Sequence, residues 1–586
     1  MIKRQWSVAA VAAFFLASGC ARVPAPSAAP RLVPADAGWV TKTLRKMALE
    51  EKIGQMIAVR FTGAFRNADS EYLKNLESLI VKTKIGGLIL FGGEVYETAE
   101  LTNAFQKVAR IPLLFASDLE RGAGNQLTNA TLFPPLMSLG ASGSEEQAYE
   151  MGRITALEGR AMGIHMTYAP VVDVNINPEN PIINTRSVGE DPALVSRIAR
   201  AFIRGCQENG MIATAKHFPG HGDTAQDSHL LLPTITADLD RLERVELAPF
   251  KDVVNAGVRA VMTSHLFVPA LDPTPNLPAT LSPAILTDLL RTKLGFRGLI
   301  VTDAMEMAGI TSSFSPEEAA LRAVLAGVDI ILLPPEPARV AEYLVTAARE
   351  GKIPARRIDD SVRRILEAKA GLGLDRNRLV RIEDIRRKVA PRPFLDQAYQ
   401  TFESAVTLVK NEGDLLPLAG ADPKIAVFSL SSDQGDYFAG RAFVAEMKKR
   451  NPEILGFFAD ADTGQEELDA DVARSAGVDT VVFALFSRLT SSKGSVDLEP
   501  KHAALVQKLA AAGRPAVVAV SFGSPYFLRH FPGIAAYVCV YRNTPETQQI
   551  AARALFGEMD INGKLPVSLP GLFPIGHGIP LKKTAK

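Results

Sequence analysis

The sequence predicts an α/β protein, in which a (β/α)8 barrel of the TIM type is followed by a smaller α/β sandwich domain. The chain has 586 residues, which is too long for one ordinary core. Between residues 38 and 372, eight short apolar runs alternate with polar loops and amphipathic helical stretches. A shorter alternation of the same kind occupies residues 393–586. Eight regular units favour a closed barrel over a doubly wound sheet.

Each of the eight runs in the first part consists of consecutive apolar residues rather than of alternating apolar and polar ones. This pattern is typical of parallel strands that are buried on both faces. Between them, residues 144–161 and 192–208 have the length and periodicity of amphipathic helices. The strands are expected at residues 56–61, 87–91, 112–116, 165–172, 211–215, 260–264, 298–302 and 329–333.

The second part has fewer apolar runs, which predicts a smaller sheet with helices on its faces. A charged linker at residues 373–392 separates it from the barrel. Its strands are expected at residues 425–430, 480–485, 517–522 and 536–540.

The first 37 residues are expected to lie outside both domains. An apolar run at 6–17 follows a short basic region, is too short to span a bilayer, and suits a signal peptide over residues 1–20. It ends in Leu-Ala-Ser-Gly-Cys, which resembles a bacterial lipobox. We therefore expect a lipid on Cys20 and a flexible tether over the Ala-, Pro- and Ser-rich residues 21–37. Ordinary cleavage after a small residue is the alternative.

Charge and cysteine content limit the possible partners. The net charge of +1 leaves no field that would attract nucleic acid or an anionic membrane surface, so membrane contact is expected only through the anchor. Beyond the leader, Cys206 and Cys539 are interpreted as small buried residues rather than as a disulfide.

Polar residues stand at the carboxyl ends of five predicted barrel strands. In a barrel these ends converge on one mouth, so the side chains are expected to share one site. Unrelated polar strand caps are the alternative, but five in register make chance a poor explanation. The residues are Asp118, Asp173, Lys216 with His217, His265 and Asp303.

The segment 216–229 contains three of the eight histidines, and its proline and glycines exclude a regular helix. Asp227 and His229 are two residues apart, which places both side chains on one side of an extended segment. A carboxylate beside an imidazole raises the imidazole pKa and gives a proton donor that works near neutrality. Two unrelated surface neighbours are the alternative.

A metal site is a further alternative for this segment, with His221, Asp223, Asp227 and His229 as the ligands. No helical His pair or Cys accompanies them. Neither a metal nor an organic cofactor is therefore expected.

The seventh predicted strand delivers Asp303 directly into a loop. A carboxylate held in this way can attack the anomeric carbon of a sugar and form a covalent intermediate that water opens. Glu306 competes for this role, but it is expected on the following helix.

The motif Lys-His-Phe-Pro-Gly-His-Gly-Asp-Thr at 216–224, followed by Asp-Ser-His at 227–229, resembles the signature of β-N-acetylhexosaminidases of glycoside hydrolase family 3. Segments 51–56, 184–192 and 301–305 are similar to other parts of the family's barrel, and 404–411 is similar to the opening of its C-terminal domain. The resemblance covers nearly the whole chain after the leader.

This resemblance implies a role for each matching residue. Asp303 is expected to be the nucleophile, and His229 the general acid and base, oriented by Asp227. The sugar hydroxyls and acetamido region are expected to be held by Arg186, Lys216 and His217, with Asp118 at the outer hydroxyls.

One segment departs from the family. Asp118 is followed by Leu-Glu-Arg-Gly-Ala-Gly, where members commonly have Gln-Glu-Gly-Gly-Arg. No role is therefore carried over to Arg121.

The implied function is that of a retaining exo-β-N-acetylglucosaminidase of the bacterial cell envelope, acting on peptidoglycan fragments or chitin-like oligosaccharides. A β-glucosidase of the same family is the nearest alternative; it would take its acid from the second domain, where Glu499 is the obvious candidate. A phosphorylase is a second alternative, because a His acid does not repel phosphate. A non-catalytic carbohydrate-binding lipoprotein is a third.

Overall fold

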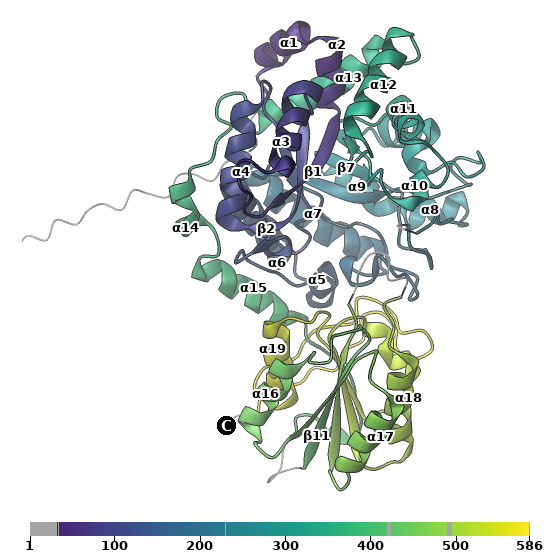
Figure 1. Ribbon diagram of the computed structural model, residues 1–586. Helices are drawn as coiled ribbons and strands as arrows, with labels where there is room; N and C mark the ends of the chain where they lie inside the picture. Colours follow the sequence, from purple (N-terminus) through teal and green to yellow (C-terminus); the bar gives the residue numbers. More distant parts are fainter. Residues whose placement is uncertain (1–31, 33, 229, 419–423, 489–494, 585–586) are drawn as a thin grey trace, which may run out of the picture.

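The structure, a computed structural model, describes residues 32, 34–228, 230–418, 424–488 and 495–584. The predicted leader with Cys20, and the single residue His229, lie outside this part of the chain. Figure 1 shows two domains, with the barrel drawn from purple to green and the second domain from green to yellow. No helix in the described part is both long enough and apolar enough to cross a membrane.

Eight parallel strands form the barrel, in the order β8-β7-β6-β5-β3-β2-β1-β9. A parallel bridge between Val301 and Ile330 joins the two end strands. The predicted barrel is therefore confirmed. Its strands are β1 (Ile57–Gly63), β2 (Gly87–Glu94), β3 (Leu114–Ser117), β5 (Met166–Thr167), β6 (Ile212–Phe218), β7 (Ala260–Thr263), β8 (Leu299–Val301) and β9 (Ile331–Leu332), and the short β4 (Leu127–Thr128) pairs with β2.

The seam between β8 and β9 depends on a buried carboxylate as well as on backbone bonds. Asp329 Oδ2 accepts the N–H of Ile300 at 2.9 Å, and its Oδ1 lies 3.0 Å from Arg364 Nη1. The Asp329 side chain is fully buried. A charged group therefore fastens the strand that leads to Asp303.

Several strand boundaries differ from the prediction, and two of these differences affect the strand-end residues. Strand β5 is much shorter than the predicted 165–172, because Pro170 has no N–H to donate to a ladder. Strand β6 extends to Phe218, so Lys216 and His217 lie inside the strand rather than after it. The Lys216 backbone bonds to Pro170 and Val172, whereas the His217 N–H donates to the Asp173 carboxylate, because the register between β6 and β7 shifts at these two residues.

The helices surround the barrel. The predicted helices 144–161 and 192–208 are present as α6 and α7, and Ser144 and Asp191 accept backbone N–H groups at their starts. The helices of this part are α1 (Ala37–Lys46), α2 (Leu49–Gln55), α3 (Glu71–Ser78), α4 (Val95–Val108), α5 (Leu136–Ser142), α6 (Glu145–Ala161), α7 (Pro192–Glu208), α8 (Leu239–Arg244), α9 (Leu247–Asn255), α10 (Ala308–Thr311), α11 (Pro316–Ala326), α12 (Pro337–Arg349) and α13 (Ala355–Gly371), with π-helices at Leu79–Thr83 and Ala284–Lys293.

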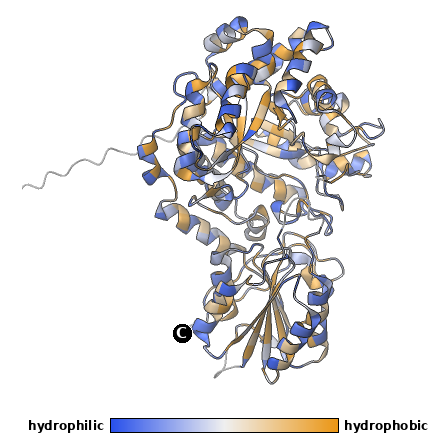
Figure 2. Cartoon of the chain, in the orientation of Figure 1, coloured by the Kyte–Doolittle hydropathy of each residue, from blue (hydrophilic) through white to orange (hydrophobic). Residues whose placement is uncertain are grey.

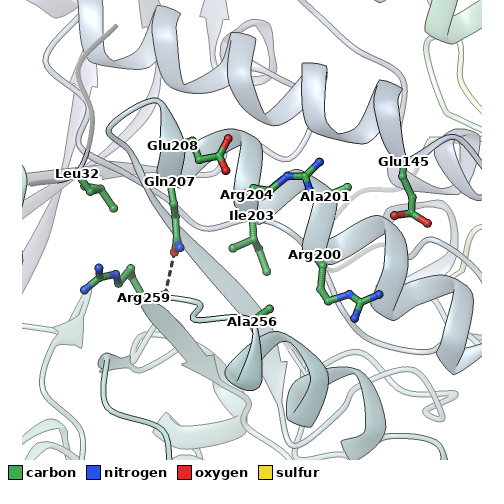
Figure 3. Close-up of a pocket in the computed structure, with 10 residues that line it drawn as sticks. All are labelled: Leu32, Glu145, Arg200, Ala201, Ile203, Arg204, Gln207, Glu208, Ala256 and Arg259. Atoms are coloured by element: carbon green, nitrogen blue, oxygen red, sulfur yellow. Dashed lines mark hydrogen bonds between the residues drawn. The ribbon is translucent and has the colours of Figure 1, made fainter.

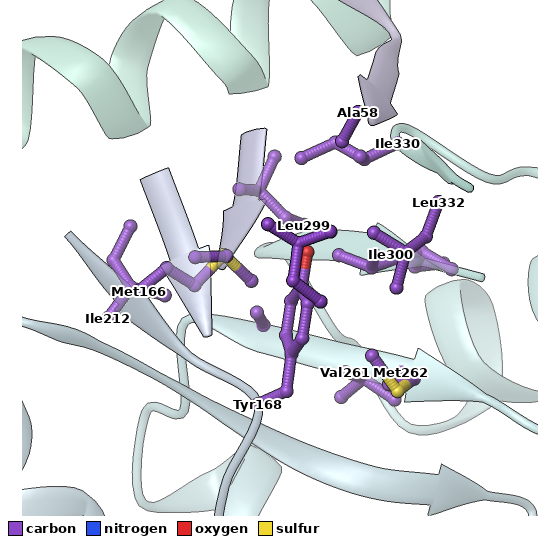
Figure 4. Packing of buried hydrophobic residues seen from close by; sticks show 14 of the residues in the cluster. Ala58, Met166, Tyr168, Ile212, Val261, Met262, Leu299, Ile300, Ile330 and Leu332 are labelled. Atoms are coloured by element: carbon purple, nitrogen blue, oxygen red, sulfur yellow. The ribbon is translucent and has the colours of Figure 1, made fainter. Parts of the chain in front are cut away.

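Apolar side chains fill the barrel. Figure 4 shows buried side chains, Met166 and Val261 among them, around the fully buried Tyr168. Figure 2 shows hydrophobic strands inside and hydrophilic helix faces outside. Cys206 and Cys539 are free and buried, which confirms their predicted place in the core. Because the interior is packed, chemistry is confined to the strand ends.

The second domain is a six-stranded sheet in the order β10-β15-β14-β13-β11-β12, in which β10 is antiparallel to β15 and the other pairs are parallel. Successive residues of β13 enter apolar clusters on opposite faces, so the predicted sandwich is confirmed. Its elements are β10 (Thr407–Asn411), β11 (Ile425–Ser431), β12 (Leu455–Ala459), β13 (Thr480–Phe486), β14 (Ala516–Ser521), β15 (Ala536–Cys539), α16 (Arg441–Arg450), α17 (Gln465–Arg474), α18 (Pro500–Ala511) and α19 (Pro545–Leu555).

Helices α14 (Ile385–Lys388) and α15 (Arg392–Ala405) lead from the barrel to the second domain (Figure 1). The second domain is then bonded to the loop that follows β5. Glu190 N–H donates to Pro566 O at 3.0 Å, and Asn175 Nδ2 donates to the Tyr526 hydroxyl at 3.0 Å. These bonds fix a barrel loop from outside the barrel.

Gly140 lies where helix α5 packs against both the loop that follows β5 and the second domain. A Cβ at this position would lie 2.0 Å from Val188 O and 2.9 Å from Pro566 Cβ. Helix propensity alone favours Ala over Gly by about 1 kcal/mol. We nevertheless expect Gly140→Ala to lower the free energy of unfolding by about 2 kcal/mol, because helix α5 would have to move away from Val188 and Pro566.

Urea denaturation followed by circular dichroism measures this change. Gly533→Ala is the matched control, because a Cβ added there would meet no atom within 4 Å beyond its chain neighbours. A Gly140→Ala protein as stable as the parent would contradict the close approach.

Candidate active site

The structure brings the predicted strand-end residues together. Lys216 contacts Asp118, His217 contacts Asp173, and, against the effect of burial, both His217 and His265 lower the pKa of Asp303. The five strand ends therefore form one site rather than scattered caps.

A buried ion cluster forms one half of this site. Lys216 Nζ lies 2.7 Å from Asp118 Oδ1 and 2.7 Å from Glu120 Oε1, and only 3% of its side chain is exposed. Arg186 donates two hydrogen bonds to the Glu120 carboxylate, at 3.0 Å from Nε and 2.8 Å from Nη2. Burial raises the pKa of Glu120, but Arg186 and Lys216 outweigh burial and hold this pKa well below its usual range. Two cations and two carboxylates thus fix one another in place.

Asp173 organises the other half. Its Oδ2 lies 2.7 Å from His217 Nδ1, and its Oδ1 accepts the backbone N–H of His221 at 2.7 Å. Burial raises the pKa of Asp173, but His217 and His221 lower it overall. The ionised carboxylate accepts a hydrogen bond from Nδ1–H, and the other ring nitrogen, His217 Nε2, lies 3.4 Å from Arg186 Nη2. Arg186 therefore belongs to both halves.

Asp303 is a fixed, ionised carboxylate. Its Oδ1 accepts the N–H of Ala304 at 2.8 Å. Burial raises the pKa of Asp303, but His217 and His265, with this hydrogen bond, lower it overall. His265 is itself held, because its Nε2 lies 3.0 Å from Ala304 O. Such a carboxylate can act as a nucleophile at neutral pH.

Asp227 is buried in the loop that follows β6. The predicted extended conformation is wrong, because the N–H groups of Leu230 and Leu231 both donate to Asp227 O, at 3.0 and 3.2 Å. A turn therefore begins at Asp227, and the spacing argument for its pairing with His229 no longer applies. His229 lies outside the described residues, so the pair remains a prediction that rests on the motif.

The loop is closed on itself next to Asp173. His221 Nε2 lies 2.9 Å from Ser228 Oγ, which joins the start of the loop to its end. Asn180 Nδ2 donates to His221 O at 2.9 Å and ties the loop to the segment after β5. The backbone on either side of residue 229 is thereby anchored near the strand ends.

A surface hollow of about 830 Å³ lies on the outer side of the barrel, between α7 and the residues near α9 (Figure 3). It is lined by Arg200, Arg204 and Arg259, and it contains none of the predicted site residues. We assign no sugar chemistry to it.

Comparison with known proteins places the chain in a family. Residues 48–368 match the model of the glycosyl hydrolase family 3 N-terminal domain, and residues 406–572 match that of the C-terminal domain. The chain belongs to glycosyl hydrolase family 3.

Relatives of this glycoside hydrolase match both of its domains. A Cellulomonas fimi protein named beta-N-acetylglucosaminidase/beta-glucosidase is 30% identical over 549 residues, which are 90% of this chain and 95% of that one. The structure of a family 3 beta-N-acetylglucosaminidase from Paenibacillus sp. str. FPU-7 has a TM-score of 0.79 at 32% identity, over 89% of this chain and 99% of that one. The structure of the beta-glucoside phosphorylase BglX, bound to 2FGlc, has a TM-score of 0.81 at 26% identity, over 91% and 96%.

In this glycoside hydrolase, the alternative metal ligand Asp223 and the alternative nucleophile Glu306 each form an ion pair with an arginine. Asp223 forms an ion pair with Arg241 at 2.8 Å, and the described residues include no group of three or more His, Cys, Asp or Glu that could hold a metal. Glu306 lies in a turn before α10 rather than on the helix where it was predicted, and it pairs with Arg60. This glutamate is half-exposed, unlike Asp303.

The rival acid, Glu499, lies in the second domain. It precedes α18, and its backbone N–H donates to Ser432 Oγ of the same domain at 3.0 Å. No described hydrogen bond or ion pair joins its carboxylate to the barrel.

Glu120 has no predicted role, and Asp173 is predicted only as a strand-end residue. Both carry most of the contacts that hold the site's basic side chains. Charge balance could have identified them, because Lys216 and Arg186 can be buried together only beside carboxylates.

We expect Glu120→Gln to lower the free energy of unfolding by about 3 kcal/mol, because Arg186 loses its carboxylate in a buried setting. Urea denaturation measures this loss. Glu145→Gln is the matched control, since its ion pair with Arg197 is half-exposed and is expected to contribute at most about 0.5 kcal/mol.

The loss of unfolding free energy in Glu120→Gln is also expected to depend on pH. A carboxyl whose folded pKa is depressed stabilises the fold above its unfolded pKa of about 4.3, and this contribution is lost as the pH falls through the folded pKa. The difference from the parent should thus be constant between about pH 6 and 8 and shrink below about pH 4.3. A stability difference that grows toward acid pH would contradict a depressed pKa of Glu120.

Proposed function

We propose that this glycoside hydrolase is a retaining exo-β-N-acetylglucosaminidase, with Asp303 as nucleophile and His229, oriented by Asp227, as general acid and base. The observation that carries the proposal is Asp303 itself, an ionised carboxylate fixed at the end of β8 beside His217, His265 and the Lys216 cluster. The printed names of the Cellulomonas and Paenibacillus relatives support the N-acetylglucosamine substrate.

The reaction is a double displacement. An Asp303 oxygen forms a bond to the anomeric carbon while the bond from that carbon to the leaving oxygen breaks, and imidazolium His229 gives its proton to that oxygen. Neutral His229 then takes a proton from water, whose oxygen attacks the anomeric carbon and releases Asp303. Two inversions give net retention of configuration.

The remaining side chains of the site bind the sugar without moving protons. Lys216 Nζ and the Arg186 guanidinium are donors held in fixed directions by Glu120 and Asp118. Fixed charged donors suit a polyhydroxylated ligand, because they orient the ring without requiring a large apolar surface.

We further propose that the natural substrates are envelope oligosaccharides, such as peptidoglycan fragments or chitin-like chains, and that a lipid on Cys20 anchors the enzyme. The support is the basic and apolar leader that ends in Leu-Ala-Ser-Gly-Cys, followed by the tether to residue 37. Metabolic labelling with a fatty acid, compared between the parent and Cys20→Ser, tests the anchor.

The substrate is tested by nitrophenol release from β-linked nitrophenyl N-acetylglucosaminide and glucoside, measured side by side. We expect kcat/KM to be at least about 100-fold higher for the acetamido sugar, since buried polar groups that lose their partner discriminate by about 3 kcal/mol. Equal or faster glucoside turnover would contradict the proposal and redirect the search for the acid to Glu499. No turnover of either would contradict exo-action on small aglycones.

Phosphorolysis is a second candidate, because the similar BglX structure is described as a beta-glucoside phosphorylase. Phosphate would replace water in the second step, with its oxygen forming the bond to the anomeric carbon. Detection of sugar 1-phosphate during turnover in phosphate buffer separates phosphorolysis from hydrolysis.

We expect Asp303→Asn to reduce kcat by about four orders of magnitude or more, because it removes the attacking oxygen. Glu306→Gln is the matched control, since this neighbouring carboxylate is half-exposed and paired with Arg60. Sugar binding by Asp303→Asn, measured by calorimetry, should persist. Turnover within tenfold of the parent would remove Asp303 from the mechanism.

A further inference from the structure

Arg529 of the second domain forms an ion-pair link between the two domains, outside the site described above. It belongs to a 3-10 helix, Pro525–His530, which follows β14. Its guanidinium pairs with Asp497 in its own domain and with Glu179 in the barrel loop that follows β5. Only 24% of the Arg529 side chain is exposed, so these pairs are partly shielded from water and salt.

Asp497 fixes the direction of this guanidinium. Its Oδ1 lies 2.7 Å from His530 Nε2, and its Oδ2 accepts a hydrogen bond from Arg529 Nη2. Burial raises the pKa of Asp497, but the hydrogen bonds with His530 and Arg529 lower it to about 2, so the carboxylate is ionised at neutral pH. The other terminal nitrogen, Arg529 Nη1, donates to Glu179 Oε1. One guanidinium therefore joins a carboxylate of the sandwich to a carboxylate of the barrel.

Glu179 occupies a turn that is closed by Asn177. The N–H of Glu179 donates to Asn177 Oδ1 at 2.9 Å, and the N–H of Asn180 donates to Asn177 O at 3.1 Å. Because Glu179 and Asn180 are consecutive in this turn, the ion pair with Arg529 also restrains the position of Asn180.

Asn180 connects the turn to the loop that follows β6. It is fully buried, and its Oδ1 accepts the N–H groups of Ile182 and Ile183 at 3.0 and 2.8 Å. These two bonds fix the orientation of the amide. Its Nδ2 donates to His221 O at 2.9 Å, so the backbone of that loop depends on where the turn lies.

His221 carries this restraint to the end of the loop. Its backbone N–H donates to Asp173 Oδ1 at 2.7 Å, and its Nε2 lies 2.9 Å from Ser228 Oγ. Ser228 directly precedes His229 in the sequence. The contacts that begin at Arg529 therefore end at the residue next to the proposed acid and base.

We propose that Arg529 is a positioning residue: from the second domain, and through the turn at 177–180, it holds the loop of His229 in place for proton transfer. The inference rests on the proposed function, in which His229 protonates the leaving oxygen. A general acid must lie within hydrogen-bond distance of that oxygen, and a displacement of about 1 Å that starts far from the chemistry can cost about 100-fold in rate. The second domain thereby contributes to acid catalysis without supplying the acid.

Two leaving groups of different basicity test this role. Nitrophenolate leaves with little protonation, whereas the sugar hydroxyl of a β-linked N-acetylglucosamine disaccharide must receive a proton as it leaves. We expect Glu179→Gln to lower kcat/KM about tenfold for the disaccharide and less than about twofold for nitrophenyl N-acetylglucosaminide, because only the disaccharide depends on a well-placed acid. A merely structural role would lower both values equally.

Glu179 is 60% exposed, so Glu179→Gln is expected to fold as the parent does. Arg529→Gln removes both ion pairs and is expected to lower the disaccharide value further, by about 30-fold, whereas Arg529→Lys keeps the charge and should recover part of this loss. Glu50→Gln is the matched control, because Glu50 forms an exposed ion pair with Arg349 between distant segments of the barrel. It should leave both kcat/KM values unchanged.

Hydrogen exchange in a peptide that covers residues 219–228 tests the contact without turnover. We expect this loop to exchange at least about threefold faster in Glu179→Gln than in the parent, and at the parent rate in Glu50→Gln. Unchanged exchange, or equal losses of kcat/KM on the two glycosides, would overturn the inference. Faster exchange in a protein whose parent hydrolyses neither glycoside would reject the proposed function and leave the restraint on the loop standing.

Discussion

The burial of Lys216 between Asp118 and Glu120 is the constraint on which the site depends. A lysine with 3% exposure stays charged only where carboxylates are within hydrogen-bond distance. Glu120 also fixes Arg186, and Arg186 Nη2 lies 3.4 Å from the Nε2 of His217, whose Nδ1 lies next to Asp173. Against the effect of burial, His217 and His265 lower the pKa of Asp303, and Lys216 adds a smaller effect in the same direction. Lys216, which is proposed to bind the sugar, therefore also acts on the carboxylate that is proposed as the nucleophile.

The second domain stabilises this arrangement without supplying a described member of the cluster. It bonds to Asn175, Asn184 and Glu190, which belong to the loop between β5 and α7. The same loop carries Asp173 and Arg186. The sandwich therefore acts as a brace for a loop that would otherwise have to hold two charged side chains in place alone. The loop and the second domain approach so closely that a Cβ at Gly189 would lie 2.3 Å from Pro566 O, so this position requires a glycine.

Much of the fold follows from the sequence because strands buried on both faces give continuous apolar runs. Strands β10 and β12 were missed: β12 is an edge strand whose Leu455 is exposed, so its pattern is weaker. The strand-end residues could be predicted because barrel geometry makes them converge. The turn at Asp227 and the role of Glu120 could not, because they depend on hydrogen bonds and on ion pairs between distant residues that no local pattern encodes.

The seam of the barrel has a consequence for how the enzyme fails on heating. Strand β8 meets β9 through a short set of bonds, fastened by the Asp329 carboxylate. Asp303 stands two residues beyond β8, so we expect opening of this seam to move the carboxylate proposed as the nucleophile before the rest of the sheet is disturbed. Enzyme activity depends on the position of a few atoms at one strand end, whereas the helix content measured by circular dichroism is an average over the whole chain. Inactivation should therefore precede melting, and the gap between the two temperatures is a measure of how well the seam is closed.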